Sequence, residues 1–89
     1  MAIMDYEFDD RKSRETFVKR GIDFDFAARI FDNEYIEWQD TRKEYPEPRF
    51  IALGPIDDHF YVVVYTWKND RRRIISARRA NRRERNVYR

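Results

Sequence analysis

Two helices are predicted in the first part of the chain from the spacing of apolar residues and from the residues that flank them. Asp9 is suited to cap a first helix that runs to Arg20, and Gly21 follows as its stop. This helix has few apolar positions, so we expect it at the rim of the core. A second helix is expected between Asp23 and Asp32. Its apolar residues recur at i, i+3, i+4 and i+7, at Phe24, Ala27, Ala28 and Phe31.

An alternation of apolar and polar residues then predicts four strands in an antiparallel meander. They are expected at residues 35–39, 49–53, 59–67 and 71–76. The third of them, HFYVVVYTW, is the most apolar run and is expected to be a central strand covered on both faces. Connections are expected at residues 40–48 (a charged, mobile loop with two prolines), 54–58 and 68–70. Tyr6–Phe8 fits a short strand or an extended lead-in.

The last segment, Ala77–Tyr88, is predicted to be a helix. One face of it would carry Ala80, Glu84, Val87 and Tyr88, while arginines spread over the opposite face. The predicted fold class is therefore α+β, with two N-terminal helices, a four-stranded antiparallel sheet and a C-terminal helix. At 89 residues, we expect a single domain over residues 1–89.

Composition narrows the chemistry that this chain can perform. It has no cysteine, which excludes disulfides and thiolate catalysis, and its one histidine argues against a zinc site. No stretch approaches the roughly 20 apolar residues that a membrane span needs, and Met1–Tyr6 lacks the regions of a signal peptide. We expect a cytoplasmic protein that uses neither a metal nor a cofactor.

Charge is distributed very unevenly along the chain. Residues 71–89 hold nine arginines and one acid, for a net charge of about +8, while the first seventy residues carry about −6. Arginine grips phosphate with two parallel hydrogen bonds and stacks on bases. The basic segment could instead be a solvated or disordered tail, but apolar residues such as Ile74, Ile75 and Val87 alternate with its arginines. We therefore expect a folded surface that binds a polyanion, with RNA as the first choice.

Arg73 is the basic residue whose position the sequence defines best. On a strand it shares a face with Arg71 and Ile75, so its guanidinium projects from a fixed place, and Arg49 at the start of an inner strand could converge with it. Glu84 falls on the face of the last helix that should be buried. We expect it to form an ion pair with Arg73, Arg49 or Arg78, in preference to acting as a general base.

Other candidate residues carry weaker signals. His59 is a candidate for proton transfer. Trp67 and Tyr88 could stack on bases, although Tyr88 is better suited to packing the last helix on the sheet. An outer set of arginines is expected to be solvated or to bind a partner: Arg79, Arg82, Arg85 and Arg89. The sequence shows neither a glycine-rich phosphate loop nor a Ser-His-Asp set.

The segment Arg73–Ala80, with sequence RIISARRA, followed by Glu84 and Tyr88, strongly resembles the BrnT family of toxins from type II toxin–antitoxin systems. The resemblance spans essentially the whole chain. Its earlier marks are YEFD at 6–9, Lys12, Lys19, Gly21, Phe24, Ala27-Ala28, Phe31-Asp32, Arg49, ALG at 52–54 and VVVYT at 62–66. Two departures stand out. Family members commonly read Lys-His-Gly where this chain has Lys19-Arg20-Gly21, and an asparagine where it has Thr16.

The resemblance implies a RelE-like fold and a ribonuclease that arrests translation. It also implies a BrnA-like antitoxin as partner, through which the complex would reach operator DNA. In this reading Arg49, Arg73 and Arg78 bind the scissile phosphate, and His59, Glu84 or Tyr88 are weaker candidates for proton transfer. Residues expected to guide the RNA are Lys19, Arg79, Arg82 and Trp67.

Two other functions are compatible with the same residues. The arginine-rich face could clamp nucleic acid without cutting it, or it could dock an acidic protein. RNA carries its own nucleophile in the 2′-hydroxyl, so an arginine-rich site needs only to orient the strand and neutralise charge. The sequence and the resemblance therefore favour a ribonuclease that needs no metal.

Overall fold

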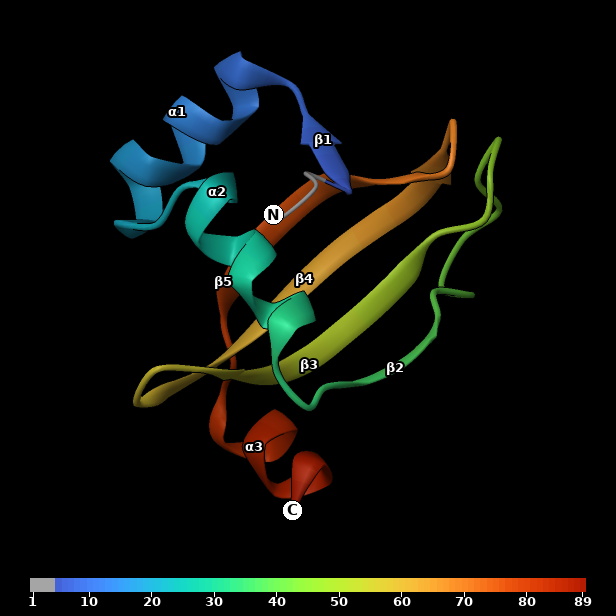
Figure 1. Cartoon of the computed structure of the whole chain (residues 1–89). Helices are drawn as coiled ribbons and strands as arrows, with labels where there is room; N and C mark the ends of the chain where they lie inside the picture. The colour runs from blue at the N-terminus through green and yellow to red at the C-terminus, as the bar shows by residue number, and fades with distance from the viewer. Residues whose placement is uncertain (1–4) are drawn as a thin grey trace.

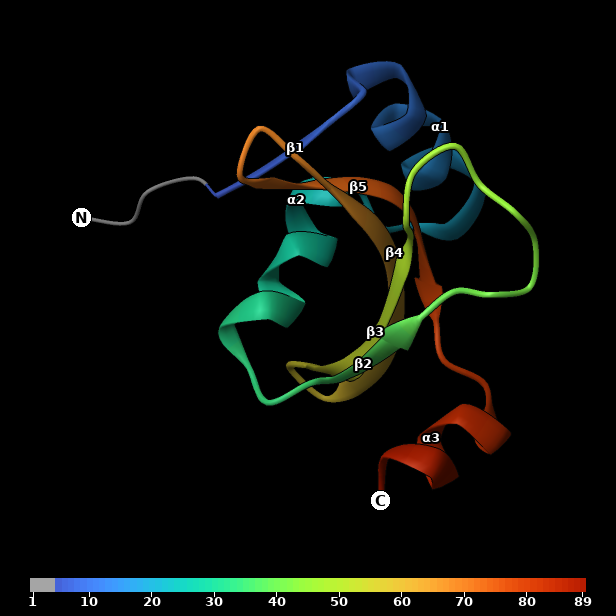
Figure 2. The same ribbon diagram turned by 90° about the vertical axis from the view of Figure 1, so that its right-hand side faces the viewer.

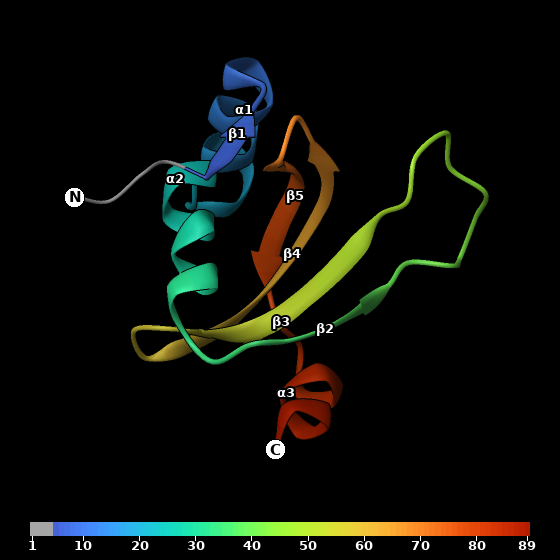
Figure 3. The same cartoon turned by 45° about the vertical axis from the view of Figure 1, so that its right-hand side comes forward.

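The computed structural model describes residues 5–89. The prediction that Met1–Tyr6 is not a signal peptide rests partly on Met1–Met4, which lie outside the described residues. The elements in chain order are β1 (Tyr6–Phe8), α1 (Asp10–Arg20), α2 (Phe24–Ala27), the 3₁₀ helix η1 (Ala28–Asp32), β2 (Ile36–Gln39), β3 (Phe50–Ile56), β4 (His59–Lys68), β5 (Arg71–Arg79) and α3 (Arg82–Tyr88). The strands form one sheet in the order β1-β5-β4-β3-β2. The helices α1, α2 and η1 gather over one face of it, and α3 stands apart from them (Figures 1 and 3). The mixed α+β class is confirmed.

Both N-terminal helices begin at the predicted capping residues. The Asp9 side chain accepts a hydrogen bond from the backbone N–H of Lys12, and the Asp23 side chain accepts one from Phe26. Gly21 adopts φ of 77°, the left-handed conformation that ends a helix at little cost for glycine. The second predicted helix is α2 continued by η1, so its later half is wound more tightly than expected.

The core lies between these helices and one face of the sheet. Phe24, Ala27 and Ile30 are fully or almost fully buried against sheet residues that include Val63 and Tyr65. We call the opposite face of the sheet the open face. There a smaller cluster (Ile51, Leu53, Val62 and Ala80) is covered in part by Tyr88 of α3. The loop over residues 40–48 and α3 both lie on the side away from η1 (Figure 2).

The sheet has five strands, so the prediction of a four-stranded antiparallel sheet is wrong in this detail. The additional strand is β1, which pairs in parallel with Arg72–Ile74 of β5. From the sequence, Tyr6–Phe8 fits a strand and an extended lead-in equally well. Its partner lies more than sixty residues away, and alternation within three residues cannot identify such a partner.

The predicted turn over residues 54–58 is also shorter than expected, because β3 continues through Gly54 and Pro55 to Ile56. Gly54 is needed for a close approach: a Cβ atom there would lie 2.8 Å from Cβ of Tyr35. The chain reverses at Asp57, whose φ is 54°. Strand β2 is present as predicted, although its side chains are exposed and not half-buried.

The final helix is shorter than the predicted Ala77–Tyr88. Ala77, Arg78 and Arg79 extend β5 by pairing with Val63, Val62 and Tyr61 of β4. Asn81 then caps α3: its side chain accepts from the backbone N–H of Glu84, whose carboxylate accepts from the N–H of Asn81. Single apolar residues among arginines are compatible with the spacing of a helix and with that of a strand. Here the segment continues as a strand, because β4 extends far enough to pair with it.

Candidate active site

A β-bulge in β5 determines which arginines reach the open face. Val64 of β4 pairs with Ser76, but the next residue, Tyr65, pairs with Ile74, so Ile75 is the extra residue. A bulge shifts the alternation of side chains by one position. Arg73 and Arg78 therefore lie on the same face of the sheet, opposite Thr66 and Val62. Arg73 shares that face with Arg71, as predicted; Ile75 is the bulged residue and pairs with no residue of β4, so its predicted face stays a prediction.

Arg49 belongs to the same face. Phe50 pairs with Tyr65, so the register places Arg49 next to Thr66, which in turn pairs with Arg73. Strands lie 4.7–4.9 Å apart, which puts the Arg49 and Arg73 backbones about 10 Å from one another. The two guanidiniums nevertheless have different surroundings, because Arg49 lies beneath the loop over residues 40–48 and Arg73 lies beside β1.

Three arginines from distant segments line one cleft of about 400 Å³ on the open face. Arg78 comes from β5, Arg20 from the end of α1, and Arg42 from the loop that follows β2. The remaining lining residues are Trp38, Ile51, Val62, Val64, Ser76 and Glu84. The cleft therefore has an apolar floor, a cationic rim and one half-exposed indole, a combination suited to a nucleotide.

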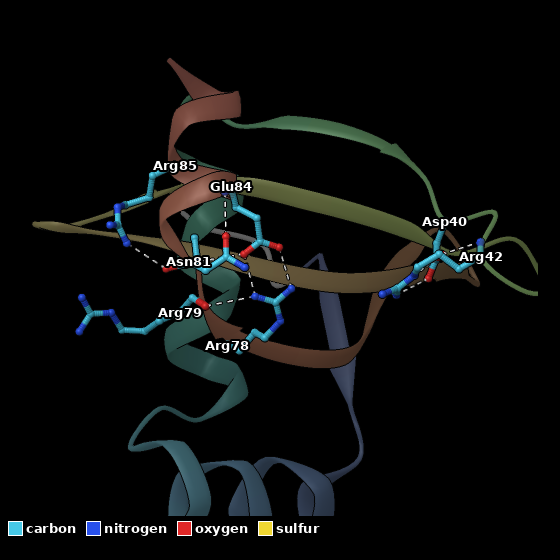
Figure 4. A network of polar contacts seen from close by, with 8 residues as sticks. Asp40, Arg42, Arg78, Arg79, Asn81, Glu84 and Arg85 are labelled. Atoms are coloured by element: carbon cyan, nitrogen blue, oxygen red, sulfur yellow. Dashed lines mark hydrogen bonds and ion pairs between the residues drawn. The ribbon is translucent and has the colours of Figure 1, made fainter.

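Arg78 is fixed at this cleft by Glu84. Its Nη1 donates to Oε1 of Glu84 at 2.8 Å and its Nη2 to Oε2 at 2.7 Å (Figure 4). This is the fork geometry in which an arginine and a carboxylate bind most strongly. The Arg78 hydrogen bonds hold the pKa of Glu84 below its ordinary value. A carboxylate bound in this way is a poor general base, so the expected ion pair is found and docks α3 on the sheet.

Arg42, Arg73 and Arg20 are also held by hydrogen bonds, the first two to carboxylates and the third to a backbone carbonyl. Arg42 donates from Nε and Nη2 to the carboxylate of Asp40, whose side chain is only 1% exposed. Arg73 Nη1 donates to Glu7 at 2.8 Å. Arg20 Nη1 donates to the carbonyl oxygen of Ala77 at 2.8 Å and forms no ion pair among residues 5–89.

Arg49 is the least satisfied of these cations. Its guanidinium carbon lies 4.1 Å from the centre of the Tyr45 ring. Its Nε is buried and has no hydrogen-bond partner in the described structure. Arg49 lines a second cleft, of about 440 Å³, with the loop over residues 40–48. It is therefore on the face of the main cleft but outside its lining.

The remaining predicted residues are dispersed. His59 and Arg79 form a pair at the end of the sheet, with Nδ1 of His59 2.9 Å from Nη2 of Arg79. Tyr88 packs on Phe60 and donates to the carbonyl oxygen of Glu34, which is the packing role that the sequence favoured. Trp67 is on the helix-covered face, where its ring meets Tyr65 edge to face and lies against the guanidinium of Arg72. Lys19 and Arg82 are exposed on helices and line neither cleft.

Arg20, Arg42 and Trp38 line the cleft but were not among the predicted site residues. Arg20 was noted only as a departure from the family pattern, and Arg42 only as part of a charged loop. Asp40, two residues before Arg42, could have indicated from the sequence that Arg42 is held in place, because the two can pair within a turn. Nothing local marks Arg20, which reaches the cleft through the packing of α1 beside β5.

Residues 5–89 contain neither a metal-binding cluster nor a helix that could span a membrane. No three or more histidine, aspartate or glutamate side chains come together in a group that could hold a metal ion. None of the described helices has the length and apolar character that a membrane crossing requires.

Comparison with known proteins gives a match to a protein family. Residues 8–84 match the family described as the ribonuclease toxin BrnT of type II toxin–antitoxin systems. No curated protein matches the chain significantly. The matched region begins in β1, ends at Glu84, and contains Arg20, Arg42 and Arg78 of the cleft. The chain belongs to the BrnT family of ribonuclease toxins.

Proposed function

We propose that this protein is an endoribonuclease that cleaves RNA at the arginine-lined cleft without a metal ion. The observation that carries the proposal is the meeting of Arg20, Arg42 and Arg78 at one cleft with an apolar floor. Two of the three are preorganised by carboxylates, so little rearrangement is needed when a phosphate binds. Preorganised donors of this kind each contribute about 10²–10³ in rate when they face developing negative charge.

The reaction we propose uses the 2′-hydroxyl of the RNA as its nucleophile. The 2′-oxygen attacks the adjacent phosphorus, a new P–O2′ bond forms, and the P–O5′ bond breaks. The proton of the 2′-hydroxyl passes to water, and the departing 5′-oxygen takes a proton from water. The guanidiniums neutralise the charge that grows on the non-bridging oxygens. The products are a 2′,3′-cyclic phosphate and a free 5′-hydroxyl.

The predicted residues take different roles in this proposal. Arg78, with Arg20 and Arg42, contacts the scissile phosphate. Arg49 and Arg73 lie on the same face and bind phosphates farther along the strand. Glu84 positions Arg78, and Tyr88 fastens α3. Lys19, Arg79 and Arg82 guide the RNA from outside the cleft.

In the cell, we propose that this activity inhibits translation and is neutralised by a BrnA-like antitoxin. The open face is the surface that such a partner must block, because it carries the cleft and most of the strand arginines. Binding of the antitoxin there would also give the complex access to operator DNA through the antitoxin's own DNA-binding part. Family membership supports the existence of an antitoxin partner.

Cleavage of an end-labelled RNA in EDTA tests the proposed reaction. We expect cut products that end in a 2′,3′-cyclic phosphate, and no cleavage of the same sequence with 2′-deoxyribose at the cleavage site. Arg78→Ala is the active-site variant, and Arg83→Ala on the exposed side of α3 is its matched control. Binding of RNA without any cut product from the parent protein would favour the non-enzymatic clamp.

A further inference from the structure

A second basic pocket lies at the end of the sheet, outside the cleft of the proposed reaction. Its volume is about 330 Å³. The floor is formed by Phe60 and Ala80, and one acid, Asp58, is present at the rim. The basic residues that line it are His59, Arg79, Arg85 and Arg89.

The pocket and the cleft are built from neighbouring residues of the same two elements. Successive residues of a strand point to opposite faces, so Arg78 faces the cleft while Arg79 faces the pocket. On α3, Glu84 faces the cleft and Arg85 faces the pocket. Figure 4 shows Arg79 and Arg85 extending to one side of α3, away from the pair of Arg78 and Glu84.

The hydrogen-bonding groups of the pocket are oriented and largely unused. Arginine can only donate, so the contact with Arg79 makes Nδ1 of His59 an acceptor and leaves the ring proton on Nε2. Arg85 donates one bond, from Nη1 to the carbonyl oxygen of Ala80 at 3.2 Å. None of Arg79, Arg85 and Arg89 forms an ion pair within residues 5–89.

The arginines of the pocket differ from those of the cleft in their ion pairing. There, Arg42 and Arg78 are each neutralised by a carboxylate, whereas three arginines share the pocket with one unpaired aspartate. Like charges held close together raise the local potential and attract an anion. A phosphate group would satisfy the arginine forks and the Nε2–H of His59 together, since it offers several acceptor oxygens around one centre.

We propose that this pocket is a second phosphate subsite, which holds the RNA backbone beyond the scissile phosphate. This proposal rests on the proposed function, because it assumes that RNA occupies the cleft. The RNA would then continue past the open edge of β5. At that edge β1 covers only Arg72–Ile74, so Arg78 and Arg79 have β4 on one side and no strand of residues 5–89 on the other. One RNA strand can therefore contact Arg78 and then Arg79, because it carries a phosphate at every nucleotide.

The test measures the binding of labelled single-stranded DNA oligonucleotides of one sequence and increasing length. DNA lacks the 2′-hydroxyl and stays uncut, so affinity is read without cleavage. We expect the parent protein to bind more tightly once the strand is long enough to leave the cleft. The double variant Arg79→Gln and Arg85→Gln should lose that gain, about tenfold in affinity, and should bind the shortest oligonucleotide as before.

The salt dependence gives a second readout. If the pocket takes one phosphate, the slope of log affinity against log salt for the long oligonucleotide should fall by about 0.7 in the double variant. Arg83→Gln, an exposed arginine of α3 that lines neither site, is the control and should leave the slope unchanged. Arg89→Gln tests the pocket without touching any hydrogen bond of the fold, in case the double variant unfolds.

Several results would overturn the subsite. One is equal affinity of parent and pocket variants for every length. Another is that a poly-glutamate peptide binds the parent but not the pocket variants, while oligonucleotide affinity does not depend on length. The pocket would then bind an acidic protein. RNA cleavage with no gain in affinity with length overturns the subsite and leaves the proposed function standing. A gain that the variants abolish, with no cleavage by the parent, supports the subsite and overturns the enzymatic function.

Discussion

Arg73 and Arg78 lie on the same face of β5, although five positions separate them. In a regular strand an odd separation places two side chains on opposite faces. The bulge at Ile75 removes that difference, because Ser76 pairs with Val64 while Ile74 pairs with Tyr65. Bulges often occur beside active sites, where they redirect a side chain. Here the bulge turns Arg78 toward the cleft while Ile74 stays in the core.

The two arginines are expected to differ in their importance for cleavage. Arg78 lines the cleft, whereas Arg73 is paired with Glu7 beside β1 and does not line it. Arg78→Ala should lower the single-turnover rate of RNA cleavage by about 10²–10³. Arg73→Ala should lower it less, mainly by weakening RNA binding, and should partly relieve growth arrest in cells. Equal rates for Arg78→Ala and the parent protein would remove Arg78 from the reaction.

Glu84 is expected to position Arg78 without exchanging a proton with the RNA. Glu84→Gln keeps the side-chain length and one acceptor oxygen for Arg78, so cleavage should fall by less than about tenfold. A general base replaced by an amide would cost about 10²–10⁴ instead. Single-turnover rates of Glu84→Gln and the parent between roughly pH 3 and pH 8 separate the two roles. A base must be deprotonated to act, so a loss of rate at the acidic end that is present in the parent and absent from the variant would identify Glu84 as the base.

Arg20 occupies the position at which the sequence resemblance leads us to expect a histidine, and it lines the cleft. Arginine stays charged and cannot exchange a proton near neutral pH, so it supplies charge alone. Arg20→His would bring a titrating group with an ordinary pKa of about 6.5 to the same rim. We expect the cleavage rate of this variant to change with pH between 5.5 and 7.5 (roughly one unit on either side of that value).

The control for this experiment is Arg20→Lys, which retains the charge and does not titrate in that range. Its cleavage rate should follow the pH dependence of the parent. If the profiles of Arg20→His and Arg20→Lys coincide, the side chain at this position takes no part in proton transfer.

The N-terminal helices followed from the sequence because their signals are local. Asp9, Gly21 and Asp23 each act within three or four residues of the helix end that they form. The four central strands were recognised for a similar reason, since alternation is visible within each run. The pairing of β1 with β5 and the bulge at Ile75 depend on a partner strand, so no local pattern contains them.

The candidate site was predicted in part. Arg78 and its ion pair with Glu84 were anticipated from the buried position of an acid among arginines, although the helix was expected to begin at Ala77. Arg20 and Arg42 were missed, because they come from a helix end and a loop that approach β5 only in the folded chain. Alternation predicted the face of Arg73 correctly and would have predicted the face of Arg78 incorrectly.

Asp40 is expected to stabilise the fold and to hold Arg42 at the cleft. Its buried carboxylate accepts hydrogen bonds from the backbone N–H and side chain of Arg42 and from Tyr45, and the Arg42 side chain holds the pKa of Asp40 well below its usual range. A pKa lowered by folding contributes stability above the unfolded value of about 3.9 and loses it as pH falls further. Asp40→Asn should therefore lower the free energy of unfolding by about 1–3 kcal/mol at pH 7. Urea denaturation should give a smaller difference at pH 3, and an undiminished one there would show that the charge of Asp40 is not its source.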